Sequence, residues 1–153
     1  MTNINPYLNF DGKAEEAMVF YKSVFGGEFM GGVMRWGEVP GCDEGEMKLS
    51  DEDKGKVMHM ALPISEGNVI MASDSLKNMG PALVVGNNVT IAVGPATREE
   101  ADRLFKGLSE GGNIQMPMAD AFWGGYFGSF EDKFGINWLI NVDTSKERKN
   151  ESS

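Results

Sequence analysis

Residues 14–27 have the sequence AEEAMVFYKSVFGG, and this stretch decides how the chain folds. Its apolar side chains recur every three or four positions, which is the period of one face of an α-helix. The residues of that face are Ala14, Ala17, Phe20, Tyr21, Val24 and Phe25. Gly26 and Gly27 follow, and glycine is common where a helix ends. The stretch therefore predicts an amphipathic helix that packs against a core.

A second helix is predicted after Thr97. The Thr97 hydroxyl can accept a hydrogen bond from the amide of Glu100 while the Glu100 carboxylate reaches back, which is the capping-box arrangement at a helix start. The predicted buried face consists of Ala101, Leu104, Phe105 and Leu108, and the helix is expected to end before Gly111-Gly112.

The second helix repeats the first. A shift of 84 residues pairs Glu15-Glu16-Ala17 with Glu99-Glu100-Ala101. The same shift pairs Tyr7-Leu8-Asn9 with Ile91-Ala92-Val93, so a short strand is predicted before each helix. Self-similarity at a fixed spacing indicates that the chain contains two copies of one structural unit.

The spacing between matching residues of the two copies becomes smaller later in the chain. There a shift of 68 matches Gly67 to Gly135 and residues 69–74 to 137–142. The fall from 84 to 68 means that sixteen residues are inserted in the first copy. The polar, glycine-rich and acidic stretch 37–55 is predicted to hold them as a surface flap, because a surface loop accommodates extra length at small entropic cost.

Each copy is expected to run strand, helix and three strands. The predicted strands are 7–10, 28–36, 57–64 and 69–73 in the first copy, and 89–93, 113–118, 126–130 and 136–142 in the second. The fold class is therefore α+β, with two βαβββ modules whose curved sheets surround a cleft. A single domain is expected over 1–143, with module 1 at about 1–75, module 2 at about 86–143, the flap at 37–55 and a polar tail at 144–153.

Composition excludes several classes of protein. With 14 Lys and Arg against 23 Asp and Glu, the formal net charge of −9 repels nucleic acid and anionic membranes. No apolar run is long enough to span a bilayer. The segment 1–6 has no basic cluster before an apolar run, and the single cysteine forms no intrachain disulfide, so a cytoplasmic location is expected.

The block order resembles a known superfamily. The resemblance is carried by paired βαβββ modules and by YLNF at 7–10, VMH at 57–59, the two helices and the run from Trp123 to Gly135. The chain is similar to the PhnB-like branch of the vicinal oxygen chelate superfamily, which includes glyoxalase I, bleomycin resistance proteins and extradiol dioxygenases. This resemblance implies a glyoxalase/bleomycin-resistance-type sheet around a cleft. It also implies a homodimer, and either a divalent metal that polarises a substrate oxygen or plain sequestration of a ligand.

Some PhnB-like sequences also carry a demethylubiquinone methyltransferase label. This chain shows no βαβ unit with a glycine-rich nucleotide loop that would hold a methyl-donor cofactor. Methyl transfer is therefore not expected.

The metal hypothesis can be examined at the positions that the resemblance implies. Metal-using relatives draw His and Glu ligands from the first and last strand of each module, where this chain has Tyr7 and Asn9, then Ile91 and Val93, on the first strands. On the last strands, at 71–74 and 139–142, only Asp74 suits a hard cation. A catalytic metal needs about three protein ligands. No metal or other cofactor is therefore expected, and any metal would be bound by Asp74 and His59.

His59 is the only histidine and the best single catalytic candidate. Strand alternation places it on the same face as Val57 and Ala61. Its neutral imidazole can act as a general base or orient a polar ligand. The alternative is a hydrogen-bonded core or interface histidine, which is favoured because no carboxylate partner lies nearby in the sequence.

Aromatic and methionine side chains indicate an apolar ligand. Trp123 and Tyr126 flank a glycine bend, where a small molecule can approach closely and stack. The predicted ligand-binding residues are Tyr7, Asn9, Trp36, His59, Met71, Trp123 and Tyr126. The alternative is that these aromatic rings fill the cleft or a dimer seam.

The sequence leaves three hypotheses about the function. The favoured hypothesis is a metal-independent protein that binds or sequesters a small molecule in the cleft between modules, without an assigned substrate. The first alternative is a divalent-metal-dependent lyase, isomerase or dioxygenase of the glyoxalase type. The second is a dimeric scaffold without a small ligand. Whether the chain is an enzyme stays open at this point.

Overall fold

The structure, a computed structural model, describes residues 2–43, 45, 48–77 and 79–145. The chain divides into two compact units, unit 1 at Met1–Val84 and unit 2 at Val85–Ser153. No helix in the described ranges is long and apolar enough to cross a membrane. Most of the predicted tail, residues 146–153, lies outside the described residues, whereas Thr144 is buried and its amide donates to the Gly124 carbonyl.

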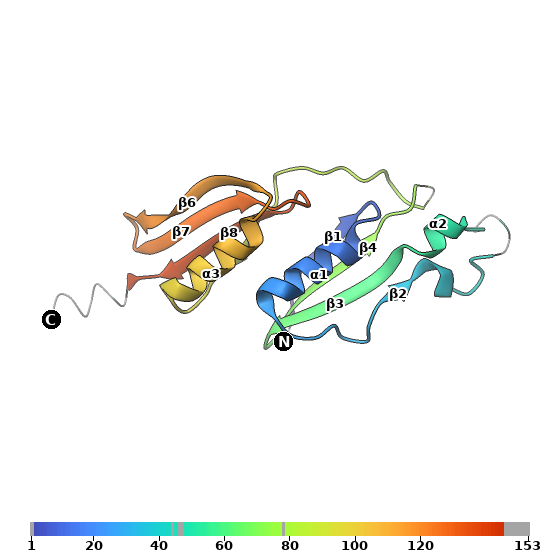
Figure 1. Cartoon of the computed structure of the whole chain (residues 1–153), viewed down its shortest axis with the longest axis horizontal. Helices are drawn as coiled ribbons and strands as arrows, with labels where there is room; N and C mark the ends of the chain where they lie inside the picture. The colour runs from blue at the N-terminus through green and yellow to red at the C-terminus, as the bar shows by residue number, and fades with distance from the viewer. Residues whose placement is uncertain (1, 44, 46–47, 78, 146–153) are drawn as a thin grey trace. The chain divides into compact units, whose positions relative to one another are not determined.

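Unit 1 is a four-stranded sheet with one long helix (Figure 1). Its elements in chain order are β1 (Tyr7–Phe10), α1 (Ala14–Phe25), β2 (Met34–Arg35), the 3-10 helix η1 (Trp36–Glu38), α2 (Asp51–Lys54), β3 (Val57–Ser65) and β4 (Asn68–Asp74). The strand order is β1-β4-β3-β2, with β1 parallel to β4 and the other pairs antiparallel.

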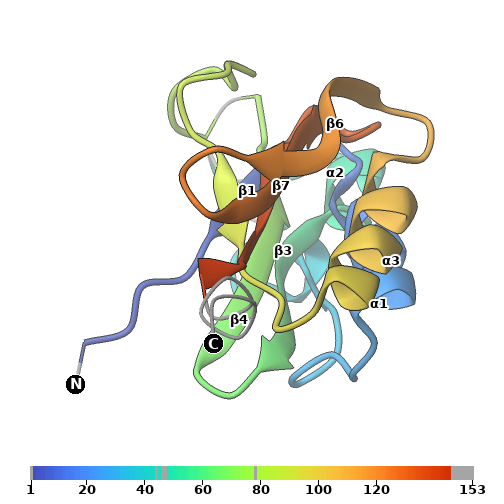
Figure 2. The same cartoon turned by 90° about the vertical axis from the view of Figure 1, so that its left-hand side faces the viewer.

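Unit 2 repeats this arrangement. Its elements are β5 (Ile91–Val93), α3 (Arg98–Ser109), β6 (Asn113–Ala121), β7 (Gly125–Glu131) and β8 (Asn137–Asp143). The strand order β5-β8-β7-β6 is the same as in unit 1, and Figure 2 shows α3 beside the β6–β7 hairpin. Helices α1 and α3 are 84 residues apart at both ends. The predicted repeat of two βαβββ modules is confirmed.

Each helix packs one apolar face on its own sheet. In α1 the buried residues are Ala14, Ala17, Met18, Tyr21 and Val24. Met18 is thus buried although it is not part of the predicted face, whereas Phe20 and Phe25 of that predicted face are not among the buried residues. In α3 the four predicted residues are all buried. The sheet face that meets α1 includes Met60 and Leu62 of β3 with Ile70 and Ala72 of β4. We call the opposite face of each sheet its open face.

The predicted second strand of unit 1 is wrong in length. A strand was expected over 28–36, but β2 covers only Met34–Arg35. Gly31 and Gly32 have φ of 75° and 73°, in the left-handed region that extended strands do not use. The regular strand therefore begins only after these two glycines, although the Met30 amide already donates to the Ala61 carbonyl of β3.

Candidate functional site

The open face of unit 1 brings together four of the predicted site residues. Tyr7 lies beside Met71, and Asn9 lies beside Ser73, in the parallel β1–β4 pairing. Met71 is also opposite Ala61, two residues after His59 on the same face of β3. Tyr7, Asn9, His59 and Met71 therefore share one surface.

Two polar pairs lie on this open face. The Tyr7 hydroxyl is 3.3 Å from His59 Nδ1, and the two rings are 5.8 Å apart at a tilt of 33°. The Ser73 hydroxyl donates to Asn9 Oδ1 at 3.3 Å. When the Tyr7 hydroxyl donates to Nδ1, the His59 proton resides on Nε2. Tyr7 is 45% exposed, so the pair is open to a polar ligand.

Asp74 does not join that surface. Its carboxylate is buried and accepts two backbone hydrogen bonds, from the Ala14 amide to Oδ1 and from the Val57 amide to Oδ2, both at 2.9 Å. Asp74 thus holds the start of α1 and the start of β3 to the end of β4. The structure does not bring Asp74 and His59 together as a metal-binding pair.

Trp36 has a structural contact at the same strand end. Its Nε1 donates to the Asp74 carbonyl at 3.1 Å, so the half-buried indole anchors η1 to β4. This contact with the Asp74 backbone gives Trp36 a structural role.

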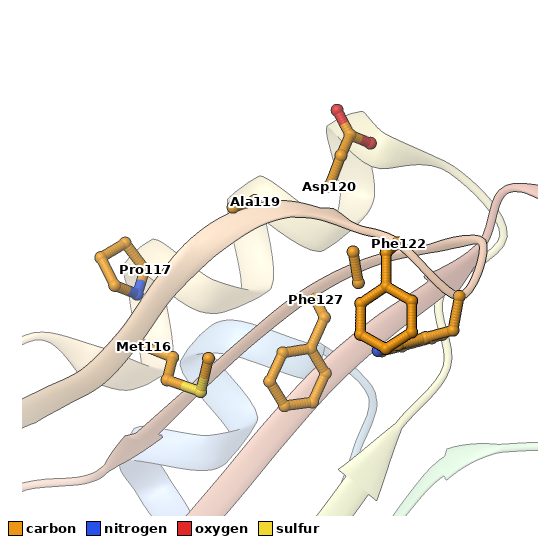
Figure 3. A pocket seen from close by; sticks show the side chains of 8 residues that line it. Met116, Pro117, Ala119, Asp120, Phe122 and Phe127 are labelled. Carbon is orange, nitrogen blue, oxygen red and sulfur yellow. The ribbon is translucent and has the colours of Figure 1, made fainter.

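Unit 2 contains an apolar hollow on its open face (Figure 3). Its volume is 360 Å³, and its lining comes from β6, from the turn after β6 and from β7. The lining residues are Met116, Pro117, Ala119, Asp120, Ala121, Phe122, Trp123 and Phe127. Phe122 is 93% exposed and Trp123 is 54% exposed, while the Trp123 ring meets Phe127 edge-on with centroids 6.0 Å apart. We call this site the aromatic hollow.

The only charged side chain of the lining turns away from the aromatic hollow. The Asp120 carboxylate is directed away from the Phe127 ring in Figure 3. It pairs with the Arg98 guanidinium of α3 at 2.8 Å. The interior of the hollow is therefore left to apolar and aromatic groups.

Gly125 gives Trp123 its position. A Cβ built on Gly125 would lie 2.1 Å from Trp123 Cζ3 and 2.5 Å from Asn141 Oδ1, which is too close for any other residue. The indole ring thus lies against the bare backbone of β7, next to the Asn141 amide. Asn141 itself is directly opposite Phe127 in the β7–β8 pairing and shares its face.

Tyr126 lies on the opposite face from Trp123. Its hydroxyl donates to Asp102 Oδ1 on α3 at 2.6 Å, and the Arg98 guanidinium lies 4.8 Å from its ring centroid. The hydrogen bond to Asp102, followed by desolvation, raises the pKa of Tyr126. The structure therefore separates two residues that the sequence analysis placed in one site.

The first strand of unit 2 is displaced by one residue from the predicted equivalence. Tyr7 pairs with Met71, whereas Leu139, the residue 68 positions after Met71, pairs with Ala92. Ala92, and not Ile91, is thus the counterpart of Tyr7 on the open face. A slip of one residue moves every side chain of a strand to the other face, so Ile91 and Val93 do not face the same way as Tyr7 and Asn9.

Sequence reasoning did not select every residue that forms the hollow. The predicted ligand-binding residues include neither Asn141 nor Phe127. The available signal was the shift of 68, which relates Asn141 to Ser73 and Phe127 to His59 on the open face of unit 1.

The donor set on the open faces does not fit a catalytic metal. Within the described ranges, no three His, Cys, Asp or Glu side chains lie together in a way that could hold an ion. On the open face of unit 1, the possible ligands are the His59 imidazole and the neutral oxygens of Tyr7, Asn9 and Ser73. Both carboxylate oxygens of Asp74 accept hydrogen bonds from backbone amides. In unit 2 the corresponding positions are Ala92, Phe127, Ser129, Leu139 and Asn141.

Known proteins resemble this chain in sequence and in fold. The family model of 3-demethylubiquinone-9 3-methyltransferase matches residues 2–141. Protein YjdN of Escherichia coli K12 is 32% identical over 147 residues, covering 91% of this chain and 94% of YjdN. Protein PA1353 from Pseudomonas aeruginosa is 32% identical with a TM-score of 0.78, covering 94% of this chain and 98% of that one.

Two further structures are similar to this chain, one in sequence and fold and the other in fold alone. The PhnB protein from Bacillus cereus, also named as a 3-demethylubiquinone-9 3-methyltransferase, is 31% identical with a TM-score of 0.69, covering 92% of this chain and 99% of that one. A glyoxylase/bleomycin resistance protein/dioxygenase domain from Frankia sp. EAN1pec has a TM-score of 0.62 at 9% identity, covering 95% and 94%, which shows the fold alone. The chain therefore belongs to the 3-demethylubiquinone-9 3-methyltransferase family and has the PhnB-like form of the glyoxalase/bleomycin resistance fold that its sequence predicted.

Proposed function

We propose that this protein binds a small apolar molecule without a metal ion, and that the ligand stacks in the aromatic hollow of unit 2. The observation that carries the proposal is the exposed aromatic surface around a 360 Å³ hollow. Ligand pockets of a few hundred Å³ with apolar and aromatic walls are typical sites for small molecules.

The exposure of the hollow's rings supports a ligand. Phe122 and Trp123 are adjacent large apolar side chains that are more than half exposed. Burying apolar surface is worth roughly 25 cal/mol per Å², so a flat ligand that covers both rings gains affinity from each. The glycines at 124 and 125 leave the ligand room to approach the backbone.

The chemistry of the donor set supports binding without metal. Lewis-acid activation of a substrate needs about three protein ligands around an ion. The His59 imidazole lies against the Tyr7 hydroxyl, and the Asp74 carboxylate accepts hydrogen bonds from two backbone amides. This donor chemistry supports binding without a metal over the first alternative, a metal-dependent lyase, isomerase or dioxygenase.

Methyl transfer does not form part of the proposal, although the family's description names it. The connections between the first strand and the helix are residues 11–13 in unit 1 and 94–97 in unit 2, each with a single glycine. A nucleotide-type cofactor loop needs several glycines between strand and helix.

The proposal is tested by screening flat apolar fragments by saturation-transfer NMR in the presence of EDTA. Wild-type protein should show contacts to aromatic fragments, and Trp123→Ala should lose them. Val19→Ala is the control, because Val19 is a 52% exposed apolar residue on α1 in the other unit. Equal binding by wild type and Trp123→Ala, or binding that occurs only when EDTA is left out, would contradict the proposal.

A further inference from the structure

Asn141 carries a buried oxygen that makes no hydrogen bond. Among the side chains that the structure describes, Asn141 Oδ1 is the one buried nitrogen or oxygen atom without a partner. Buried polar atoms are hydrogen-bonded in the great majority of cases, so an exception calls for an explanation. An unpaired buried acceptor costs about 1–3 kcal/mol, which a ligand with a donor group would recover.

The unpaired oxygen lies at the edge of the aromatic hollow. Asn141 is opposite Phe127, which lines the hollow, and both Asn141 Oδ1 and the Trp123 ring crowd the space above Gly125. Trp123 and Asn141 Oδ1 are therefore near neighbours beside Gly125, at the edge of the aromatic hollow.

Trp123 is lightly held. More than half of it is exposed, and its ring contact is the edge-on one with Phe127. It lies in the turn between β6 and β7, next to Gly124, whose φ is 94°. Side chains in such a turn change rotamer readily, so the indole can turn aside and stack on a ligand.

We infer that Asn141 is a specificity-determining residue, whose Oδ1 accepts a hydrogen bond from a flat apolar ligand that carries an O–H or N–H group. This inference rests on the proposed function, because it requires a ligand in the aromatic hollow. It adds the class of ligand: an aromatic molecule with one donor at its edge, such as a phenol or an aromatic N–H heterocycle. In this arrangement the Trp123 ring turns from its place beside Asn141 and stacks on the ligand.

Two probes that differ in one donor test this inference. 2-Naphthol and 2-methoxynaphthalene have the same flat ring system, but only 2-naphthol has an O–H group. Their dissociation constants are measured by NMR titration on wild type, Asn141→Leu and Asn141→Ala. Leucine has the branched shape of asparagine, although it is larger, and it removes the acceptor, while alanine removes the acceptor without any risk of crowding Trp123.

Wild type should bind 2-naphthol about two- to tenfold more tightly than its methyl ether, which is the effect of one hydrogen bond. Both variants should bind the two probes equally. The thermal midpoint of Asn141→Leu should not fall below that of wild type, because no native hydrogen bond is lost. A purely structural role for Asn141 would instead lower that midpoint and leave the probe preference unchanged.

Each other outcome overturns a different statement. Equal binding of the two probes to wild type, or tighter binding of the ether, overturns the role of Asn141 and leaves the aromatic hollow as a binding site. No binding of either probe at millimolar concentration overturns the proposed function, and this inference with it.

Discussion

Replacing Asp74 by asparagine tests whether this residue is structural. The carboxylate is 2% exposed and accepts from the amides of Ala14 and Val57, each at 2.9 Å. Hydrogen bonds to a charged group are worth about 1.5–3 kcal/mol each, so the pair contributes about 3–6 kcal/mol. An asparagine side chain keeps one oxygen that accepts a hydrogen bond. Its NH2 group would face the second backbone N–H, which then has no acceptor. We therefore expect Asp74→Asn to lower the free energy of unfolding by about 2–4 kcal/mol.

The measurement for Asp74→Asn is urea denaturation combined with amide hydrogen exchange. The amides of Ala14 and Val57 should exchange faster in the variant, because these are the two groups that lose the carboxylate. Asp120→Asn is the control, since Asp120 is exposed and its ion pair with Arg98 is worth little. A variant as stable as wild type, with both amides still protected, would refute this account of Asp74.

Two further predictions concern unit 2. Gly125→Ala should displace the Trp123 indole from the β7 backbone, because the new methyl group would lie 2.1 Å from Cζ3; the nitrogen–proton signal of the Trp123 indole should therefore shift in the ligand-free protein, and an unchanged signal would mean that Trp123 does not lie there. Tyr126→Phe should cost about 0.5 kcal/mol at neutral pH, because the bond to Asp102 is exposed, and should leave fragment binding intact. The pKa of Tyr126 is raised above its ordinary value of 10.0, so this stabilisation is complete below pH 10 and disappears as the pH rises through the raised pKa; denaturation curves of wild type and variant should therefore converge at high pH.

The sequence predicted the helices well because their signals are local. Thr97 Oγ1 accepts from the Glu100 amide at 3.2 Å, as expected. The other half of the capping box is replaced, since the Glu100 carboxylate accepts from Arg103 instead, and this hydrogen bond lowers the pKa of Glu100. Residues three or four positions apart meet on a helix, so periodicity and caps are sufficient to place it.

The site was harder to predict because it depends on pairing between distant segments. The partners of the Asp74 carboxylate are 60 and 17 residues away in the sequence, so its structural role has no local pattern. Tyr126 was grouped with Trp123 by proximity in sequence, yet the strand places them on opposite faces. The displacement of β5 by one residue, which turns Ile91 away from the open face, likewise depends on the register between β5 and β8. That register is set by pairing in the folded sheet.

The central claim is that a small molecule binds in the aromatic hollow without metal, and indole N–H signals test it most directly. The chain has three tryptophans, and Trp123→Phe assigns the signal of Trp123 in a nitrogen–proton spectrum. Titrating 2-naphthol in buffer with EDTA should move the Trp123 signal and leave that of buried Trp138 in place. A Trp123 signal that stays fixed, or that moves only after a divalent metal is added in place of EDTA, would contradict the claim.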